Sequence, residues 1–343
     1  MSVKVSVLGA TGYGGGELIR LLSRHPGVEL VAVTSRSREG VPVSAIHKNL
    51  EGLTDLCFST PGEDELVERS DVIVGAMPHG ASAEVLAPLV DRGAKVVDLS
   101  GDFRLRDAAT YARWYKREHP RHDLMQHAVY GCPEAHREAM RGARLIASPG
   151  CFATAINLAL LPAAPSLAGQ PVVVAMTGSS GSGADASAGT HHPTRAQTLR
   201  PYKVLAHQHT PECVQLLKQH GADALEGLVF TPVSAPLVRG IVAVVTAPLI
   251  PGADPEAVAD RYRAFYATHP FVKVLASREP ECAPIAGTNY AEVRARATAD
   301  GRLHVVCAID NLVKGGAGQG VQALNLMMGL DEEQGLDWPG TWP

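Results

Sequence analysis

A cysteine at a turn is the first residue whose chemical type could carry a reaction. Cys151 follows Pro149-Gly150 and precedes an apolar stretch at helical spacing, so it should lie in the first turn of a helix. Free backbone N–H groups and the positive end of the helix dipole at that place lower a thiol pKa and can bind an oxyanion. This setting favours a nucleophilic thiolate, although a small buried cysteine is the commoner fate of this residue type.

Two histidines further along the chain could supply proton transfer. His207 and His209 are two residues apart, and Glu212 follows in the first turn of a predicted helix with Thr210 as its N-cap and Pro211 at its first position. In an extended stretch this spacing points both imidazoles the same way, and Glu212 could orient His209, which is nearer, as the general acid and base. One of the two histidines could instead be structural. A zinc site would need a third ligand at a suitable spacing, so we expect no metal.

A glycine-rich loop near the N-terminus predicts a dinucleotide site. It lies between a predicted strand over 3–8 and an amphipathic helix, and glycines in that context let the backbone approach a pyrophosphate. The next predicted strand, 29–34, ends in Ser35 and Arg36, where an NAD site would carry an acidic residue. A hydroxyl and a guanidinium suit the 2′-phosphate of NADP(H), unless Arg36 is only a solvated charge. The residues predicted to hold NADP(H) here are Gly9, Thr11, Gly12, Tyr13, Gly14, Gly15, Ser35 and Arg36.

Other strand ends and one loop extend the predicted site. Strands over 70–77 and 94–100 should end at the sheet edge where cofactor and substrate meet. The Gly-Ser loop over 177–184 could cradle a phosphoryl group or the nicotinamide ribose, or be a flexible linker. No acidic residue occurs over 186–211, whereas three residues there are cationic, which suits an anionic substrate. These features predict Pro78 and Gly181 at the cofactor, and Ser100, Arg104, Arg195 and Lys203 at the substrate.

Composition limits the class of protein. The chain has 343 residues, of which 45% are hydrophobic and 19% charged, with a net charge of −4. This composition predicts a soluble protein of two domains and gives no sign of nucleic-acid binding. Six cysteines without a disulfide-like spacing favour the reducing cytoplasm. Met1 leads straight into a strand without a signal peptide, and the longest apolar run, 241–250, is too short to span a membrane.

The order of predicted elements gives an α/β fold class. Before residue 150, strands and helices alternate, as in a Rossmann-type domain with a parallel sheet. After the Cys151 helix, β-branched strands follow one another more closely, which predicts a mixed or antiparallel sheet in a second, α+β domain. These later strands are predicted over 228–234, 241–250, 290–298 and 302–309.

These motifs together resemble the acyl-phosphate-reducing semialdehyde dehydrogenases, and specifically the N-acetyl-γ-glutamyl-phosphate reductase family. The resemblance covers the whole chain and is carried by Gly9-Ala10-Thr11-Gly12-Tyr13, Pro149-Gly150-Cys151, His207-Gln208-His209-Thr210-Pro211-Glu212 and Asp310-Asn311-Leu312-Val313-Lys314-Gly315, in that order. It implies an NADP-binding domain over 1–150 completed by 311–343, and a catalytic and oligomerisation domain over 151–310. It also implies Asn311 at the cofactor, His209 as the acid and base, and a homodimer or homotetramer.

A narrower resemblance concerns the substrate. His191-His192-Pro193, Tyr202-Lys203 and Gly287-Thr288-Asn289 are similar to a subgroup that acts on aminoadipyl phosphate carried by a small amino-group carrier protein in lysine biosynthesis. The resemblance thus implies NADPH-dependent reduction of carrier-bound 2-aminoadipate 6-phosphate to a semialdehyde, through a thioester on Cys151. The cationic stretch before the histidines would suit an acidic carrier.

Other functions stay open at this point. The first alternative is free N-acetyl-γ-glutamyl phosphate in arginine biosynthesis, or both substrates. A cysteine hydrolase or acyltransferase would use Cys151 and His209 but no dinucleotide, and the glycine loop with Arg36 argues against it. A non-catalytic NADP-sensing protein is disfavoured by the same pair, Cys151 and His209.

Overall fold

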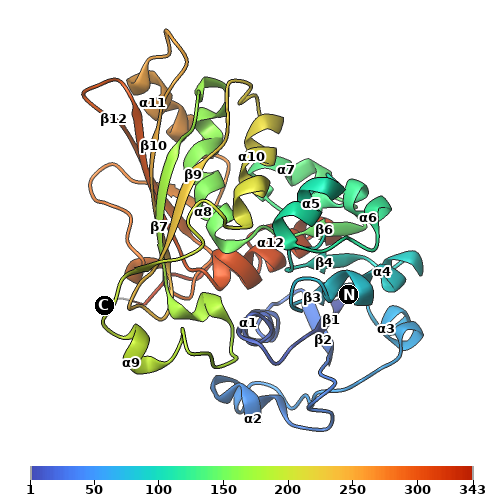
Figure 1. Ribbon diagram of the computed structural model, residues 1–343. Helices are drawn as coiled ribbons and strands as arrows, with labels where there is room; N and C mark the ends of the chain where they lie inside the picture. The colour runs from blue at the N-terminus through green and yellow to red at the C-terminus, as the bar shows by residue number, and fades with distance from the viewer. Residues whose placement is uncertain (1, 342–343) are drawn as a thin grey trace. The chain divides into compact units, whose positions relative to one another are not determined.

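A computed structural model describes residues 2–341 and shows two compact units (Figure 1). One unit contains residues 2–150 and 316–338, and the other contains residues 151–315 and 339–341. The chain passes from the first unit to the second between Gly150 and Cys151. The chain returns to the first unit at residue 316, within the π-helical turn Val313–Ala317. Residues 1, 342 and 343, which the predicted domain bounds include, lie outside the described residues.

The first unit is built on a six-stranded sheet in the order β2-β1-β3-β4-β6-β5, with all of its described strand pairs parallel. Apolar residues such as Val5, Val7 and Val74 are fully buried in it, as in parallel sheets covered on both faces. The strands are β1 (Val3–Leu8), β2 (Val28–Val33), β3 (Val72–Gly75), β4 (Val96–Asp98), β5 (Val129–Tyr130) and β6 (Leu145–Ala147). The helices are α1 (Tyr13–Leu22), α2 (Val43–Ile46), η1 (Lys48–Leu50), α3 (Glu63–Arg69), α4 (Ser82–Asp91), α5 (Ala108–Tyr115), α6 (His122–His127), α7 (Pro133–Met140) and α12 (Gly318–Met328).

The strand order reverses at β1, because the chain goes from β1 to β2 on one side and then to β3 on the other. Ligands of open parallel sheets bind at the carboxyl ends of the strands at such a switch point. Gly9 follows β1 there with a φ of +75°, and a Cβ at this position would lie 2.8 Å from Cγ of Met77 and 2.9 Å from the carbonyl oxygen of Ala76. Only glycine therefore allows the chains after β1 and β3 to approach this closely.

The second unit is built on a seven-stranded mixed sheet in the order β11-β12-β13-β10-β7-β9-β8. The pairs β7–β9 and β11–β12 are parallel, and the other described pairs are antiparallel. The strands are β7 (Val172–Thr177), β8 (Arg200–Pro201), β9 (Val229–Ser234), β10 (Ile241–Ala247), β11 (Val272–Val274), β12 (Ala291–Ala297) and β13 (Leu303–Ile309). The helices are α8 (Cys151–Leu160), η2 (Leu161–Ser166), η3 (Ser179–Ser182), α9 (His192–Arg195), α10 (His209–Gln219), α11 (Pro255–Tyr266), η4 (Ala283–Ile285) and the π-helical η5 (Val313–Ala317). The prediction of a mixed or antiparallel second sheet is confirmed.

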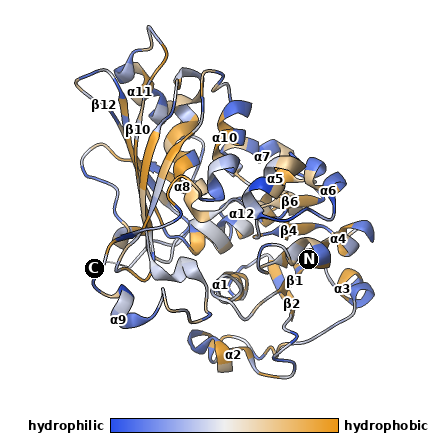
Figure 2. Cartoon of the chain, viewed as in Figure 1, coloured by the Kyte–Doolittle hydropathy of each residue, from blue (hydrophilic) through white to orange (hydrophobic). Residues whose placement is uncertain are grey.

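Helix α8 forms the centre of the second core. Every residue of α8 after Cys151 is buried, and it lies against β10, β13 and α10. Figure 2 shows hydrophobic residues along α8 and on the strand β10. The inner side chains of β10, Ala243 and Val245, are fully buried. On β7 the alternate residues Val172 and Val174 are 45% and 39% exposed, so this sheet keeps apolar side chains on its other face as well.

Among the described residues, none of the helices combines the length and the apolar character that crossing a bilayer requires. Within residues 2–341, no group of three or more histidine, cysteine, aspartate or glutamate side chains is arranged to hold a metal ion.

Candidate active site

Cys151 is the first residue of α8, as the Pro-Gly turn before it predicts, and it is half-buried. Strand β6 ends at Ala147, so Ser148-Pro149-Gly150 connects strand and helix. Nε of Arg104 donates to the carbonyl of Ser148 at 2.7 Å, which holds the start of this connection in place. The N-terminus of α8 offers the electrostatic setting that favours a thiolate.

The π-helical turn η5 lies against Cys151. A Cβ at Gly315 would lie 2.8 Å from the Cβ and 3.2 Å from the Cα of Cys151. The backbone N–H of Gly315 donates to the carbonyl of Asp310 at 2.9 Å, which closes the wide turn. Single π-turns of this kind are frequent at functional sites. The sequence argument missed Gly315, because nothing local to it indicates contact with a residue so far away in the chain.

His207 and His209 lie side by side near the start of α10. Their ring centroids are 4.5 Å apart, and Nδ1 of His207 accepts the backbone N–H of His209 at 3.2 Å. The ring of Phe152, the residue after Cys151, lies 5.3 Å from the ring of His207 and 6.0 Å from that of His209. Within the second unit, the fold thus brings the start of α8 and both histidines to one place.

Glu212 lies beside His209, as predicted. Its Oε1 is 3.8 Å from Nε2 of His209, and both side chains are buried. Helix α10 begins at His209 with Gln208 as its N-cap, so the prediction that Thr210 caps the helix is wrong. The chain turns at Gln208 rather than staying extended, and the two imidazoles meet edge to face instead of pointing in parallel.

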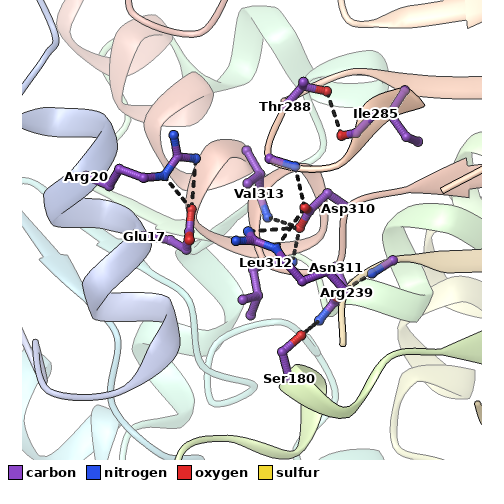
Figure 3. A network of polar contacts seen from close by, with 12 residues as sticks. Glu17, Arg20, Ser180, Arg239, Ile285, Thr288, Asp310, Asn311, Leu312 and Val313 are labelled. Atoms are coloured by element: carbon purple, nitrogen blue, oxygen red, sulfur yellow. Dashed lines mark hydrogen bonds and ion pairs between the residues drawn. The ribbon is translucent and has the colours of Figure 1, made fainter. Parts of the chain in front are cut away.

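Asp310 and Asn311 hold three loops of the second unit together (Figure 3). The carboxylate of Asp310 accepts Nε and Nη2 of Arg239 at 3.0 and 3.3 Å, and the backbone N–H of Gly287 at 2.7 Å. Asn311 accepts the backbone N–H of Gly240 at 2.7 Å and donates to Oγ of Ser180 at 2.9 Å. Asn311 therefore fixes the loop of the predicted cofactor residue Gly181, which is exposed next to Ser180. Arg239 was not predicted, since an arginine in a turn gives no local signal of an ion pair.

The glycine loop of the first unit fits a dinucleotide pyrophosphate. A Cβ at Gly15 would lie 2.6 Å from Cα of Ala10, so this glycine allows α1 to pack on the loop. At Gly12 and Gly14 a Cβ would meet nothing within 4 Å, so the loop presents open backbone on that side. Gly12 precedes α1, whose N-terminus has no side-chain cap and no acidic residue in its first turn. An anion at that N-terminus would find free N–H groups and no competing carboxylate.

The residues after β2 and β3 complete this edge of the sheet. Ser35 is buried, and its Oγ lies 3.5 Å from Oγ of Ser37, while Arg36 is exposed. Pro78 is also exposed, and its neighbour His79 accepts the backbone N–H of Gly101 through Nδ1 at 2.7 Å. The strand ends that were predicted to lie at one edge are thus joined by hydrogen bonds.

Ser100 and Arg104 are buried and support the backbone. The hydroxyl of Ser100 donates to Oδ2 of Asp98 at 2.6 Å. Burial raises the pKa of Asp98 to about 6, although the hydrogen bonds from Ser100 and Ser82 lower it. Nη2 of Arg104 donates to the carbonyl of Leu99 at 2.8 Å. Their described contacts serve the fold, and their substrate contacts stay predictions.

The three cations of the acid-free segment 186–211, of which Arg195 and Lys203 were predicted at the substrate, differ in exposure. Arg200 and Lys203 are exposed, and Nζ of Lys203 donates to Oε1 of Gln208 at 3.0 Å. Arg195, the last residue of α9, is only 8% exposed. The three residues therefore do not form one uniform charged surface.

Two family models together match most of the chain. Residues 4–143 match the NAD binding domain of semialdehyde dehydrogenases, and residues 151–311 match their dimerisation domain. With the parallel and mixed sheets described above, these matches confirm the predicted fold class.

The chain is also similar to curated relatives over its whole length. It is 40% identical to the N-acetyl-gamma-glutamyl-phosphate reductase of Methanosphaera stadtmanae, over 99% of both chains. It is 43% identical to that of Desulforudis audaxviator, over 99% of this chain and 100% of the relative. A protein of Thermomicrobium roseum, named putative LysW-L-2-aminoadipate 6-phosphate reductase, is 44% identical over 100% of both chains.

Solved structures share the fold at lower identity. Aspartate semialdehyde dehydrogenase II of Vibrio cholerae has a TM-score of 0.71 at 18% identity, over 95% of this chain and 98% of that one. Aspartate semialdehyde dehydrogenase of Candida albicans with NADP has a TM-score of 0.70 at 16% identity, over 95% of this chain and 98% of that one.

Proposed function

Because the chain belongs to the N-acetyl-γ-glutamyl-phosphate reductase family, we propose that Cys151 is the nucleophile with which it reduces an acyl phosphate to a semialdehyde. The enzyme is an oxidoreductase of the semialdehyde dehydrogenase type with an NAD(P)-binding domain. The observation that carries the proposal is the position of Cys151 at the first residue of α8, with Phe152 against both His207 and His209.

In the proposed mechanism the thiolate of Cys151 attacks the acyl carbonyl carbon, the carbon–oxygen bond to phosphate breaks, and a thioester remains. NADPH, when bound, supplies the hydride that reduces this thioester. His209 first takes the proton of the Cys151 thiol, then gives a proton to the oxygen of the thiohemiacetal, and removes it again as the carbon–sulfur bond breaks. Glu212 holds the imidazole of His209 and stabilises its charged form.

The residues proposed to hold the cofactor centre on the glycine loop of the first unit. The open backbone at Gly12 and Gly14 would hold the pyrophosphate, together with Gly9, Thr11, Tyr13 and Gly15 around them. Ser35 and Arg36 would bind the 2′-phosphate, which makes NADP(H) the preferred cofactor. Pro78 of the first unit is proposed as a further cofactor residue, and so are Gly181 and Asn311 of the second unit.

We infer free N-acetyl-γ-glutamyl phosphate as the first substrate candidate, because most of the relatives that match the chain end to end are N-acetyl-gamma-glutamyl-phosphate reductases. Carrier-bound aminoadipyl phosphate is the second candidate. It is favoured by the similarity to the Thermomicrobium roseum protein and by the exposed cations Arg200 and Lys203, which would suit an acidic carrier.

We also infer a homo-oligomer. The match of residues 151–311 to a dimerisation domain and the exposed valines of β7 support it. Light scattering of the purified protein should give a dimer or a tetramer.

The purified enzyme should be assayed with NADP⁺, inorganic phosphate and each of the two semialdehydes. Cys151→Ser should lose at least about a hundredfold in rate, since loss of a covalent step usually costs more than that. Cys57→Ser, at an exposed cysteine, is the matched control and should keep wild-type activity. A Cys151→Ser enzyme with more than about a hundredth of wild-type activity would exclude Cys151 as the nucleophile.

A further inference from the structure

Arg239 pairs with a carboxylate that is completely buried. Its Nε and Nη2 donate to the two oxygens of Asp310 at 3.0 and 3.3 Å, and the Asp310 side chain has no exposed surface. A buried carboxylate is strongly destabilising unless a cation and further hydrogen bonds compensate for its lost hydration. Figure 3 shows that these further donors include backbone N–H groups of the turn that follows Asp310. The Arg239 guanidinium therefore supports the charge on which that turn depends.

The turn after Asp310 is held by both the side chain and the backbone of this residue. Oδ1 of Asp310 accepts the backbone N–H groups of Leu312 at 2.8 Å and Val313 at 3.1 Å. The Asp310 carbonyl accepts the N–H of Gly315 at 2.9 Å. Gly315 is the residue at which a Cβ would lie 2.8 Å from the Cβ of Cys151. The shape of the turn at Asp310 therefore determines how η5 lies against Cys151.

The backbone before Arg239 holds a second loop. The carbonyl of Leu237 accepts the N–H of Ser179 at 2.8 Å, and the carbonyl of Val238 accepts that of Ser180 at 3.0 Å. Both serines belong to the Gly-Ser loop, for which a role at a phosphoryl group or the nicotinamide ribose is predicted. The side chains of Leu237 and Val238 are 45% and 71% exposed, so apolar packing of these two residues does little to fix the segment. Because the Arg239 side chain reaches the turn before η5, one ion pair joins the two loops.

We propose that Arg239 is a positioning residue, which acts through Asp310 to hold η5 against Cys151 and to keep the Gly-Ser loop in place. This proposal rests on the proposed role of Cys151 as the nucleophile. Without the guanidinium, the Asp310 carboxylate would lose the cation that compensates for its burial, and it would have to move toward water or be protonated. In either case the hydrogen bonds that shape the turn weaken. A shift of the thiol by about 1 Å is enough to slow the reaction about a hundredfold.

The first test follows the turn itself and needs no turnover. Amide hydrogen exchange, measured by mass spectrometry on peptides that cover residues 310–317, reports on the N–H groups bound to Asp310. Exchange should accelerate at least about tenfold in Arg239→Gln, since a charge-assisted hydrogen bond that holds the turn closed is lost. Arg239→Lys keeps the charge but not the planar fork that reaches both carboxylate oxygens, so it should show a smaller acceleration. Unchanged exchange in the folded variants would overturn the proposal.

Arg278→Gln is the matched control, because Arg278 also pairs with a buried carboxylate of the second unit. Its Nη1 donates to Oε2 of Glu292 at 2.8 Å, and Glu292 is a residue of β12. Arg278→Gln should lower stability to urea about as much as Arg239→Gln does, and it should keep wild-type kcat and wild-type exchange at 310–317. Equal losses of kcat in the two variants would overturn the proposal, because general destabilisation would then explain both.

The second test asks whether Arg239 acts through Asp310. Arg239→Gln and Asp310→Asn should each lower kcat at least about tenfold, with a smaller effect on the KM for the semialdehyde. The double variant should lose no more than the worse single variant, because both changes break one unit. Losses that multiply would overturn the proposal in favour of two independent roles. If Cys151→Ser keeps its activity, the proposed function fails, and hydrogen exchange at 310–317 still decides whether Arg239 holds the turn.

Discussion

The backbone of Gly315 lies against the side chain of Cys151, so closely that a Cβ at position 315 would be 2.8 Å from the Cβ of Cys151. Real Cβ atoms do not approach each other to this distance, and the second contact, with the Cα of Cys151, is backbone and cannot rotate away. Gly315→Ala must therefore displace η5 or the start of α8. Because a misplacement of about 1 Å can cost about a hundredfold in rate, we expect kcat to fall at least about tenfold.

The control for Gly315→Ala is Gly62→Ala at the start of α3, where a Cβ would meet nothing within 4 Å. It should keep wild-type kcat. Alkylation of Cys151 should also slow or accelerate in Gly315→Ala, since the thiol changes its environment. Wild-type kcat and alkylation rate in a folded Gly315→Ala enzyme would show that this contact does not position Cys151.

Arg36 should determine the preference for NADPH over NADH. It is exposed directly after Ser35, past the end of β2, and makes no ion pair within the part of the chain described, residues 2–341. Arg36→Ala should weaken NADPH binding about ten- to a hundredfold, the value of a charge-assisted contact with the 2′-phosphate, and leave NADH binding nearly unchanged. Fluorescence titration with both cofactors measures this. An equal loss for the two would mean that Arg36 supports the fold instead.

Local sequence signals predicted the parts of the site that depend on neighbouring residues. The Pro-Gly turn before Cys151 and the glycines after β1 act through nearby backbone, so their positions followed from the pattern. The prediction that Thr210 caps α10 was wrong, because the chain turns at Gln208 and the helix begins at His209. This turn accompanies the packing of His207 against His209, which the sequence pattern does not show.

The contacts between distant segments could not be predicted. Arg239 and Asp310 are 71 residues apart in sequence, and neither has a local feature that indicates the ion pair. The burial of Arg195 is likewise a tertiary result, since a four-residue helix with a charged end normally faces solvent. Sequence patterns describe local backbone, whereas these contacts depend on how the strands of the second sheet are ordered.

Exposed cations beside the histidines should distinguish the two substrate candidates. The double change Arg200→Glu with Lys203→Glu reverses two exposed charges. If an acidic carrier protein presents the substrate, this variant should lose more activity with the carrier-bound substrate than with free N-acetyl-γ-glutamyl phosphate, and salt should weaken wild-type binding of the carrier. Arg113→Glu with Lys218→Glu, at two other exposed positions, is the charge-matched control. Equal losses with the two substrates would contradict a carrier.

His25 should make stability fall in mild acid. It is buried in the first unit, where its Nε2 lies 3.0 Å from Oδ1 of Asn325 and its Nδ1 accepts the backbone N–H of Gly27 at 3.1 Å. Burial lowers the pKa of His25 below its ordinary value of 6.5. Below pH 6.5 the unfolded chain therefore binds a proton at this histidine that the folded chain does not bind. The free energy of unfolding must then decrease as the pH falls. Between pH 7.5 and 5.5 this histidine should account for a decrease of at most about 1.4 kcal/mol in the free energy of unfolding, because the lower pH lies one unit below its ordinary pKa.

Urea unfolding at both pH values should show a smaller decrease in the free energy of unfolding for His25→Gln than for wild type. Exposed His192→Gln is the control. The same decrease in all three proteins would mean that His25 is protonated in the folded state.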